Sequence, residues 1–328
     1  MRHFGIALMV ALASSGWCLA QGSPFSALHN RLQDGAQAFV ISNYPEEVVI
    51  PGIVFDEAFA QDARVFYYHK NGAPLPLDLQ LTVTNPQSKP LWVTVNVGLA
   101  GPSPDGLYVG HKAAKAYLMD TKPQRILVPA FGTLSLAKTT LKPGQVCEGI
   151  VGVYAGQNPF RLSLAVVDPA VPYVATLLKD MAVPAYTFGR FSSATVESVT
   201  SFDCGDKLQE WGLGDEPFAV DVVRRLTLKG NYGFHYYYAT QLTNTQALPR
   251  KVTLLYAPSA GMSRAVLCVN DKWIETKLFR PHNQDQPESV FEAILQPGES
   301  RWLTVFATPQ GGGFYPVRFV LRAMAVSP

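Results

Sequence analysis

The sequence predicts an all-β protein of two tandem antiparallel β-sandwich domains, with a short helical insertion in the first. Apolar and polar residues alternate along Leu77–Thr84 and again along Leu91–Gly98, as expected for strands with one buried face. Similar short runs recur along the chain between turn residues, which favours sandwiches over alternating strands and helices. The third observation is an internal echo: Thr84–Thr94 and Thr243–Thr253 share six identical positions at an offset of 159 residues.

Further landmarks extend this echo into two units. Leu141–Gly144 (LKPG) is matched by Leu295–Gly298 (LQPG), and Phe160–Leu162 by Val317–Phe319 in a later apolar run. Each unit spans about 145 residues, the size of an ordinary domain rather than of a stacking repeat. We therefore expect a first domain over residues 21–168, a proline-bounded linker over 169–184 and a second domain over 185–328.

The echoed segment itself reads as a strand, a turn and a returning strand. Asn85 and Asn244 stand at the strand ends, where asparagine tolerates turn conformations and hydrogen-bonds the turn backbone. Pro90 and Pro249 cannot donate to a sheet ladder, so each marks where the next strand begins. The sequence predicts that this strand–turn–strand occupies the same place in both sandwiches.

The echoed pattern resembles immunoglobulin-like and fibronectin-type modules of bacterial secreted and cell-surface proteins. In those modules an alternating strand ends in Thr-Asn, a short proline-containing turn follows, and a Val/Thr strand returns. Thr84–Thr94 and Thr243–Thr253 carry the resemblance. It implies an immunoglobulin-like fold and no catalytic residue. The first unit lacks the immunoglobulin Cys…Trp…Cys signature, and no basic anchor pair matches the two-domain periplasmic assembly chaperones.

The N-terminus predicts export. Arg2 precedes the apolar run Phe4–Ala13, and small residues lead to a predicted cleavage after Ala20, so residues 1–20 read as a signal peptide. The apolar run is too short to cross a bilayer, which takes about 20 residues. The alternative of a lipidated Cys18 is disfavoured by the bulky Trp17 before it. We expect a protein of the periplasm, cell surface or extracellular space, with no transmembrane segment in the mature chain.

The amino-acid composition limits the classes of partner that the protein is expected to bind. The chain has 27 Lys and Arg against 25 Asp and Glu, and charged residues make up only 16% of it. No basic cluster is present, which disfavours nucleic acid as a partner. An apolar fraction of 48% is sufficient for two cores, and 25 Pro with 26 Gly suits a β protein with many turns.

The mature chain has an odd number of cysteines. They are Cys147, Cys204 and Cys268, and the last two fall in the second unit. In an oxidising compartment a Cys204–Cys268 disulfide is one candidate, and three buried thiols are the equal alternative.

Catalytic and metal-binding motifs are missing from the sequence. It holds no nucleophile elbow, phosphate-binding loop or His-Glu-x-x-His, and no histidines at metal-ligand spacing. We therefore predict no cofactor and no metal, and we favour a non-enzymatic protein. The alternative is a secreted carbohydrate-active enzyme or hydrolase on a β-sandwich scaffold, whose carboxylates would meet only in the fold.

The predicted helical insertion is the first candidate binding site. Residues 101–119 place His111, Lys112 and Lys115 on a short helix after a Pro/Gly-rich stretch, where an anion or a partner carboxylate could bind. The alternative is a helix that only covers the end of the sandwich. Rigid sandwiches tend to carry function in such loops.

Aromatic residues form the second candidate site. Tyr67, Trp92 and Tyr237 lie in strand-like runs and are predicted to face outward, where they could stack on sugars or anchor a protein. The alternative is cross-strand pairing within the sheets. Together these observations predict surface assembly, adhesion or binding of an envelope or surface protein or a glycan.

Overall fold

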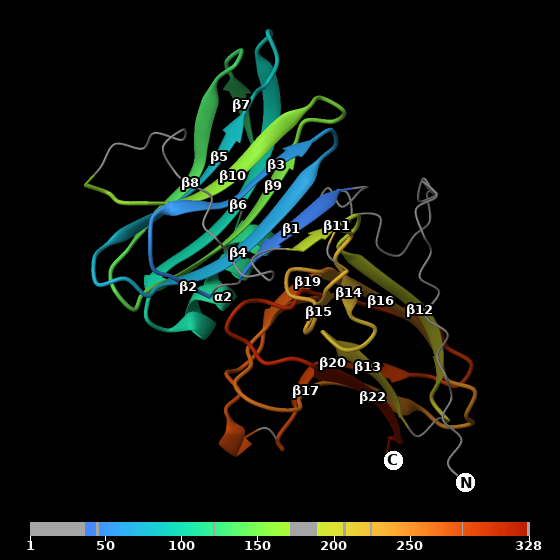
Figure 1. The fold of residues 1–328 in the computed structure, drawn as a ribbon. Coiled ribbons are helices and arrows are strands. Elements are labelled where there is room, and N and C mark those ends of the chain that lie inside the picture. Colours follow the sequence, from blue (N-terminus) through green and yellow to red (C-terminus); the bar gives the residue numbers. More distant parts are fainter. Residues whose placement is uncertain are drawn as a thin grey trace.

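The computed structural model describes residues 37–43, 46–120, 122–170, 189–205, 208–223, 225–283 and 285–326 (Figure 1). These residues form several predominantly antiparallel sheets and one α-helix, which confirms the predicted all-β class and the helical insertion. The predicted signal peptide and most of the predicted linker lie outside the described residues.

Eleven strands form the first pair of sheets. They are β1 (Ala38–Ser42), β2 (Glu47–Val48), β3 (Gly52–Phe59), β4 (Ala63–Asn71), β5 (Leu77–Thr84), β6 (Leu91–Ser103), β7 (Gln124–Val128), β8 (Thr133–Leu141), β9 (Val146–Tyr154), β10 (Phe160–Val167) and β11 (Gly189–Phe191). Sheet A has the order β11-β1-β4-β9-β6-β7, with β2 also beside β4, and sheet B has the order β3-β10-β5-β8. Apolar side chains of both sheets form one shared core.

The later strands form the second pair of sheets. They are β12 (Thr195–Asp203), β13 (Gln209–Leu213), β14 (Ala219–Val220), β15 (Thr227–Leu228), β16 (His235–Thr243), β17 (Arg250–Pro258), β18 (Val266–Val269), β19 (Lys272–Glu275), β20 (Glu288–Leu295), β21 (Ser300–Ala307) and β22 (Val317–Ala325). Sheet C has the order β12-β16-β21-β18-β19, sheet D the order β13-β22-β17-β20, and β14 pairs with β15 alone.

The two pairs of sheets have the same strand order. The path β1-β4-β9-β6-β7 of sheet A corresponds to β12-β16-β21-β18-β19 of sheet C, and β3-β10-β5-β8 corresponds to β13-β22-β17-β20. In sheets A and C the two strands that begin this path, β1 with β4 and β12 with β16, run parallel. One connection differs. The helical insertion joins β6 to β7, whereas β18 and β19 are joined by a tight turn with positive φ at Asn270 and Asp271.

This correspondence corrects the predicted position of the echo. Because β16 corresponds to β4, the counterpart of Asn244 is Asn71 and not Asn85. Asn71 donates from its backbone N to Gln145 O at 2.8 Å and from Nδ2 to Leu141 O at 2.8 Å. Asn244 donates in the same way to Glu299 O at 2.9 Å and to Leu295 O at 3.0 Å.

The echo nevertheless has a physical cause. Asn85 Nδ2 donates to Lys89 O at 2.8 Å, and Asn85 Oδ1 accepts from the Gln87 N–H at 3.0 Å. Asn244 repeats these contacts with Leu248 O at 3.0 Å and the Gln246 N–H at 3.0 Å. The same asparagine-anchored turn therefore occurs at two places that are not equivalent in the fold, and the turn chemistry alone makes the sequences alike.

The two pairs of sheets pack closely against each other. The core of sheets C and D continues into Phe39, Phe66 and Ile150, which lie on the face of sheet A opposite its own core. Strand β11 belongs to the predicted second domain by residue number, but Phe191 pairs with Phe39 on β1 of sheet A. The apolar core therefore continues from one unit into the other.

Helix α2 (Gly106–Lys115) has a capping residue at its start and buries one face against the rest of the protein. Asp105 is the N-cap, and its Oδ1 accepts from the Tyr108 N–H at 3.0 Å. The chain continues as a π-helical turn, Ala116–Asp120. Gly98 on β6 allows this segment to approach, because an added Cβ would lie 2.4 Å from Tyr117 Cβ. The helix therefore lies directly on sheet A.

The predicted Cys204–Cys268 disulfide is wrong. Both residues and Cys147 are buried thiols. Cys204 follows the end of β12 that lies beside Thr243, whereas Cys268 lies at the level of Tyr237. Those levels are about 20 Å apart along β16 at roughly 3.3 Å per residue. A disulfide needs Cα atoms within about 7 Å, so the two thiols cannot meet.

Candidate functional site

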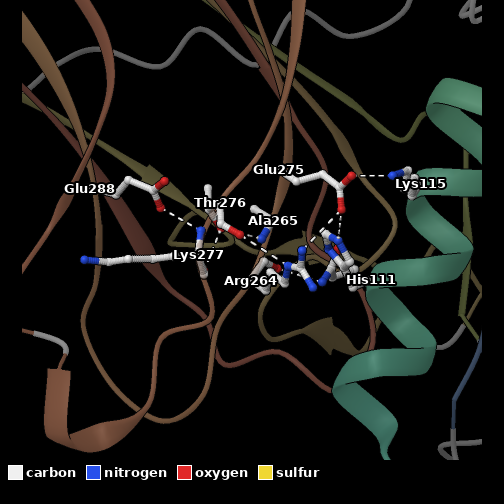
Figure 2. A network of polar contacts seen from close by, with 9 residues as sticks. His111, Lys115, Arg264, Ala265, Glu275, Thr276, Lys277 and Glu288 are labelled. Atoms are coloured by element: carbon white, nitrogen blue, oxygen red, sulfur yellow. Dashed lines mark hydrogen bonds and ion pairs between the residues drawn. The ribbon is translucent and has the colours of Figure 1, made fainter.

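The predicted helix residues His111 and Lys115 meet a carboxylate of the second unit. His111 Nε2 lies 2.8 Å from Glu275 Oε2 on β19, and Lys115 Nζ forms an ion pair with Glu275 Oε1 (Figure 2). Arg264 adds a contact from Nη2 to Glu275 Oε2 at 3.3 Å. A carboxylate does bind these side chains, as the sequence suggested, but it comes from the chain itself and fastens α2 to sheet C.

The protonation states follow from these contacts. The hydrogen bonds from Lys115 and His111 lower the pKa of Glu275 to about 2, so Glu275 is ionised at neutral pH. Burial lowers the pKa of His111, although the Glu275 hydrogen bond opposes this effect. A carboxylate only accepts, so Nε2 carries the proton of the neutral ring. His111 Nδ1 has no hydrogen-bond partner in the described part of the chain.

Replacing Glu275 with glutamine should lower the free energy of unfolding by about 1 kcal/mol at neutral pH, because the pairs are partly exposed to solvent. A lowered folded-state pKa means that this stabilisation is complete above the ordinary value of 4.5 and is lost as the pH falls toward 2. Urea unfolding of both proteins should therefore give curves that converge in acid. Glu292→Gln, at an exposed pair with Lys251, is the control and should change little. Curves that stay separated at low pH would contradict this account.

The other predicted site residues do not join this cluster. Lys112 lies over the Tyr108 ring at 5.9 Å. Trp92 is 50% exposed, and the guanidinium of Arg125 covers one of its faces at 4.6 Å. The six predicted residues therefore form no single site.

The expected outward orientation of Tyr67 and Tyr237 is wrong, since both are buried. Tyr67 faces the core between sheets A and B. Tyr237 lies on the same face of β16 as His235, and the first unit covers that face: the rings of Tyr117 and His235 are 6.3 Å apart. The alternation of residues along a strand does not show whether a second unit covers the outer face of that strand.

A buried arginine fastens the units at a second point. Arg64 of β4 is 2% exposed, and its Nη1 lies 2.6 Å from Nδ1 of His235 on β16. Its Nη2 donates to Ala194 O at 3.0 Å and to Gly233 O at 3.3 Å. A buried guanidinium with several acceptors fixes the distance between sheets A and C, because separating them would leave a buried charge unpaired.

Both units line a cleft of about 680 Å³. The first unit contributes Asn43, Glu46, Phe66, Tyr68 and residues 104–107 at the start of α2. The second contributes Tyr232, Met262, Leu278, Arg280 and the glycine-rich residues 311–314 between β21 and β22. The walls of this cleft come from segments that lie far apart in sequence.

Glu148 lies next to the glycine-rich wall of the cleft. This β9 residue stands between Tyr68 and Ala100 in sheet A and is fully buried. Its Oε2 accepts from the Gly311 N–H at 3.0 Å, and its Oε1 has no hydrogen-bond partner among the described residues. Burial raises the pKa of Glu148 to about 8, although the Gly311 hydrogen bond opposes this. Glu148 is therefore largely protonated at neutral pH.

Glycines allow the wall to form. An added Cβ on Gly110 of α2 would lie 1.9 Å from Gly311 O, so only a glycine permits this approach. Sequence reasoning missed the cleft residues because none of them forms a local motif. The run of three glycines at residues 311–313 was the available signal, since adjacent glycines often mark a close backbone approach.

No group of three or more His, Cys, Asp or Glu side chains among the described residues is arranged to hold a metal ion. No helix in the same part of the chain is both long and apolar enough to cross a membrane.

Comparison with known proteins gives little guidance. No protein-family profile and no curated protein matches the chain. Among solved structures, Lac15 from a marine microbial metagenome is similar over 89% of this chain, with 15% identity and a TM-score of 0.17. The chain spans 62% of that chain's length. A likeness this low carries no argument about function.

Proposed function

We propose that this protein is an exported, non-enzymatic binding protein of the cell envelope or the extracellular space, and that it takes its ligand in the inter-unit cleft. The observation that carries this proposal is a preformed cleft of about 680 Å³ with polar and apolar walls. Clefts at domain interfaces are preferred places for ligands. The contacts of Arg64, Glu148 and Glu275 hold the walls in place without a ligand.

We further propose that the chain consists of two tandem immunoglobulin-like sandwiches over residues 21–168 and 185–328, joined by residues 169–184 and preceded by a signal peptide. In this arrangement β11, at the start of the second range, pairs with β1 of the first. The repeated strand order of the two pairs of sheets supports this proposal. Assembly or adhesion at the cell surface would then use the cleft to hold a protein or a glycan of the envelope.

Cross-linking and affinity capture from the envelope and medium of the exporting cells test this function. Wild-type protein should capture a ligand that a Leu278→Ser, Phe314→Ser double variant does not. Both side chains line the cleft and are 37% and 53% exposed, so their loss should leave the fold intact. Trp302→Ser removes a 45% exposed aromatic residue of β21 and is the matched control. Equal capture by the double variant would show that the cleft is not the binding site.

A secreted carbohydrate-active enzyme is the second candidate, and one observation favours it. Glu46 and Asp105, both of the first unit, line the cleft, and glycosidases use a pair of acidic residues. Incubation with envelope polysaccharide and mass spectrometry of the products separates the candidates. Products that appear with wild-type protein and disappear with Glu46→Gln would identify an enzyme.

A further inference from the structure

Resting on the proposed function, we propose that the cleft binds an extended peptide segment of a partner protein, in which lysine or arginine stands next to large apolar side chains. The cleft has one acidic wall and one apolar wall, and they belong to different units. A ligand that satisfies both needs a cation and aliphatic or aromatic groups at close spacing, which is peptide chemistry.

The first unit supplies the acidic wall. Glu46 and Asp105 both line the cleft, and Arg280 is the lining cation that the second unit contributes, so the formal charge of these side chains is negative. Tyr68 stands in the field of both carboxylates, which contribute to the raised pKa of its phenol after the larger effect of burial. An approaching cation is therefore favoured over an anion.

The second unit supplies the apolar wall. Met262, Leu278 and Phe314 are 39%, 37% and 53% exposed, and all three line the cleft. Large apolar side chains that gather in an exposed hollow mark a binding surface. Two of the three are aliphatic and offer no flat ring, so this wall suits leucine, methionine or phenylalanine side chains better than it suits sugars.

The polar groups at the base suit a peptide backbone. Tyr68 lines the cleft, and its Oη lies so near Gly106 that an added Cβ there would be 2.1 Å away. Its phenol therefore stands at the start of α2, where it can donate to a carbonyl of a bound peptide. Tyr232 Oη already donates to Gly313 O at 3.0 Å, so that phenol shapes the wall.

The test is selection from a phage-displayed library of random peptides against the immobilised mature protein, with a glycan array probed in parallel. The charge variant is Glu46→Gln with Asp105→Asn, because asparagine keeps the N-cap of α2 and removes only the charge. The control variant is Glu197→Gln, at an exposed carboxylate of β12 away from the cleft.

We expect the selected peptides to be enriched in lysine or arginine beside leucine, methionine or phenylalanine. The charge variant should bind a synthetic copy of the leading peptide about fivefold to tenfold more weakly, and the control variant should bind it equally. Selected peptides without basic residues, or equal binding by the charge variant, would overturn the inference. Glycan binding without peptide binding would also overturn it while leaving the proposed function in place, and failure of both libraries would refute both.

Discussion

The Glu148→Gln variant should be more stable than the wild type in mild alkali, and the two proteins should be nearly equally stable in mild acid. The folded-state pKa of Glu148 is about 8, raised by burial from 4.5. Between these values the folded protein binds the proton that the unfolded chain releases, so stability falls as the pH rises. The loss reaches at most about 5 kcal/mol once the pH exceeds the folded pKa, at roughly 1.4 kcal/mol per unit. Glutamine has the same shape and no proton to lose, so it removes this dependence.

Chemical denaturation across the range from about pH 5 to about pH 9 measures the effect. The wild type should lose stability steadily over that range, whereas Glu148→Gln should give a flatter profile. Glu197→Gln, at an exposed position on β12, controls for the removal of one carboxylate. Parallel profiles for Glu148→Gln and the wild type would show that Glu148 is already ionised or hydrated in the folded protein.

The ionisation of Glu148 also bears on the cleft. Gly311, which donates to Glu148 at 3.0 Å, lies in the cleft wall. The buried Oε1 has no partner among the described residues, so a second negative oxygen there would be poorly solvated. We expect amide hydrogen exchange in residues 309–315 to speed up above about pH 8 in the wild type, beyond the intrinsic rise with pH, and to do so less in Glu148→Gln.

The sequence predicted the strands well because their information is local. Alternation along Leu77–Thr84 placed β5 at the same residues that form it. Helix formers after a Pro/Gly stretch located α2 within residues 101–119, and the observed helix spans Gly106–Lys115. The LKPG and LQPG turns precede β9 and β21, which do correspond in the two sheets.

The sequence-based predictions were wrong where contacts between distant segments of the chain determine the position or burial of a residue. The turns at Asn85 and Asn244 share their chemistry but not their place, and only strand pairing distinguishes Asn71 as the true counterpart. Burial of Tyr237 depends on the first unit, which lies more than a hundred residues earlier in the chain. The cleft is likewise invisible in sequence, because its walls come from both units.

Replacing Gly110 with alanine should destabilise the protein, although the same change stabilises an isolated helix by about 1 kcal/mol. The added Cβ would lie 1.9 Å from Gly311 O and 2.7 Å from Gly311 C, and these are backbone atoms that no side-chain rotation can move. Gly311 cannot withdraw without breaking its hydrogen bond to the buried Glu148. Overpacking of this kind typically costs about 1–3 kcal/mol, so we expect a net loss near 2 kcal/mol.

Whether Gly110→Ala lowers or raises the free energy of unfolding shows whether α2 packs tightly against Gly311 or only loosely. Lys112→Ala is the matched control, because it places the same methyl group on the exposed face of the same helix, away from Gly311. Thermal and urea unfolding should show a loss for Gly110→Ala and almost no change for Lys112→Ala, and limited proteolysis should cut residues 309–315 faster in the glycine variant. Because those residues form one wall of the cleft, the same variant should also bind the cleft ligand more weakly. A stability gain for Gly110→Ala would mean that α2 and the glycine-rich segment are not in contact in solution, and the preformed cleft would then have no fixed wall.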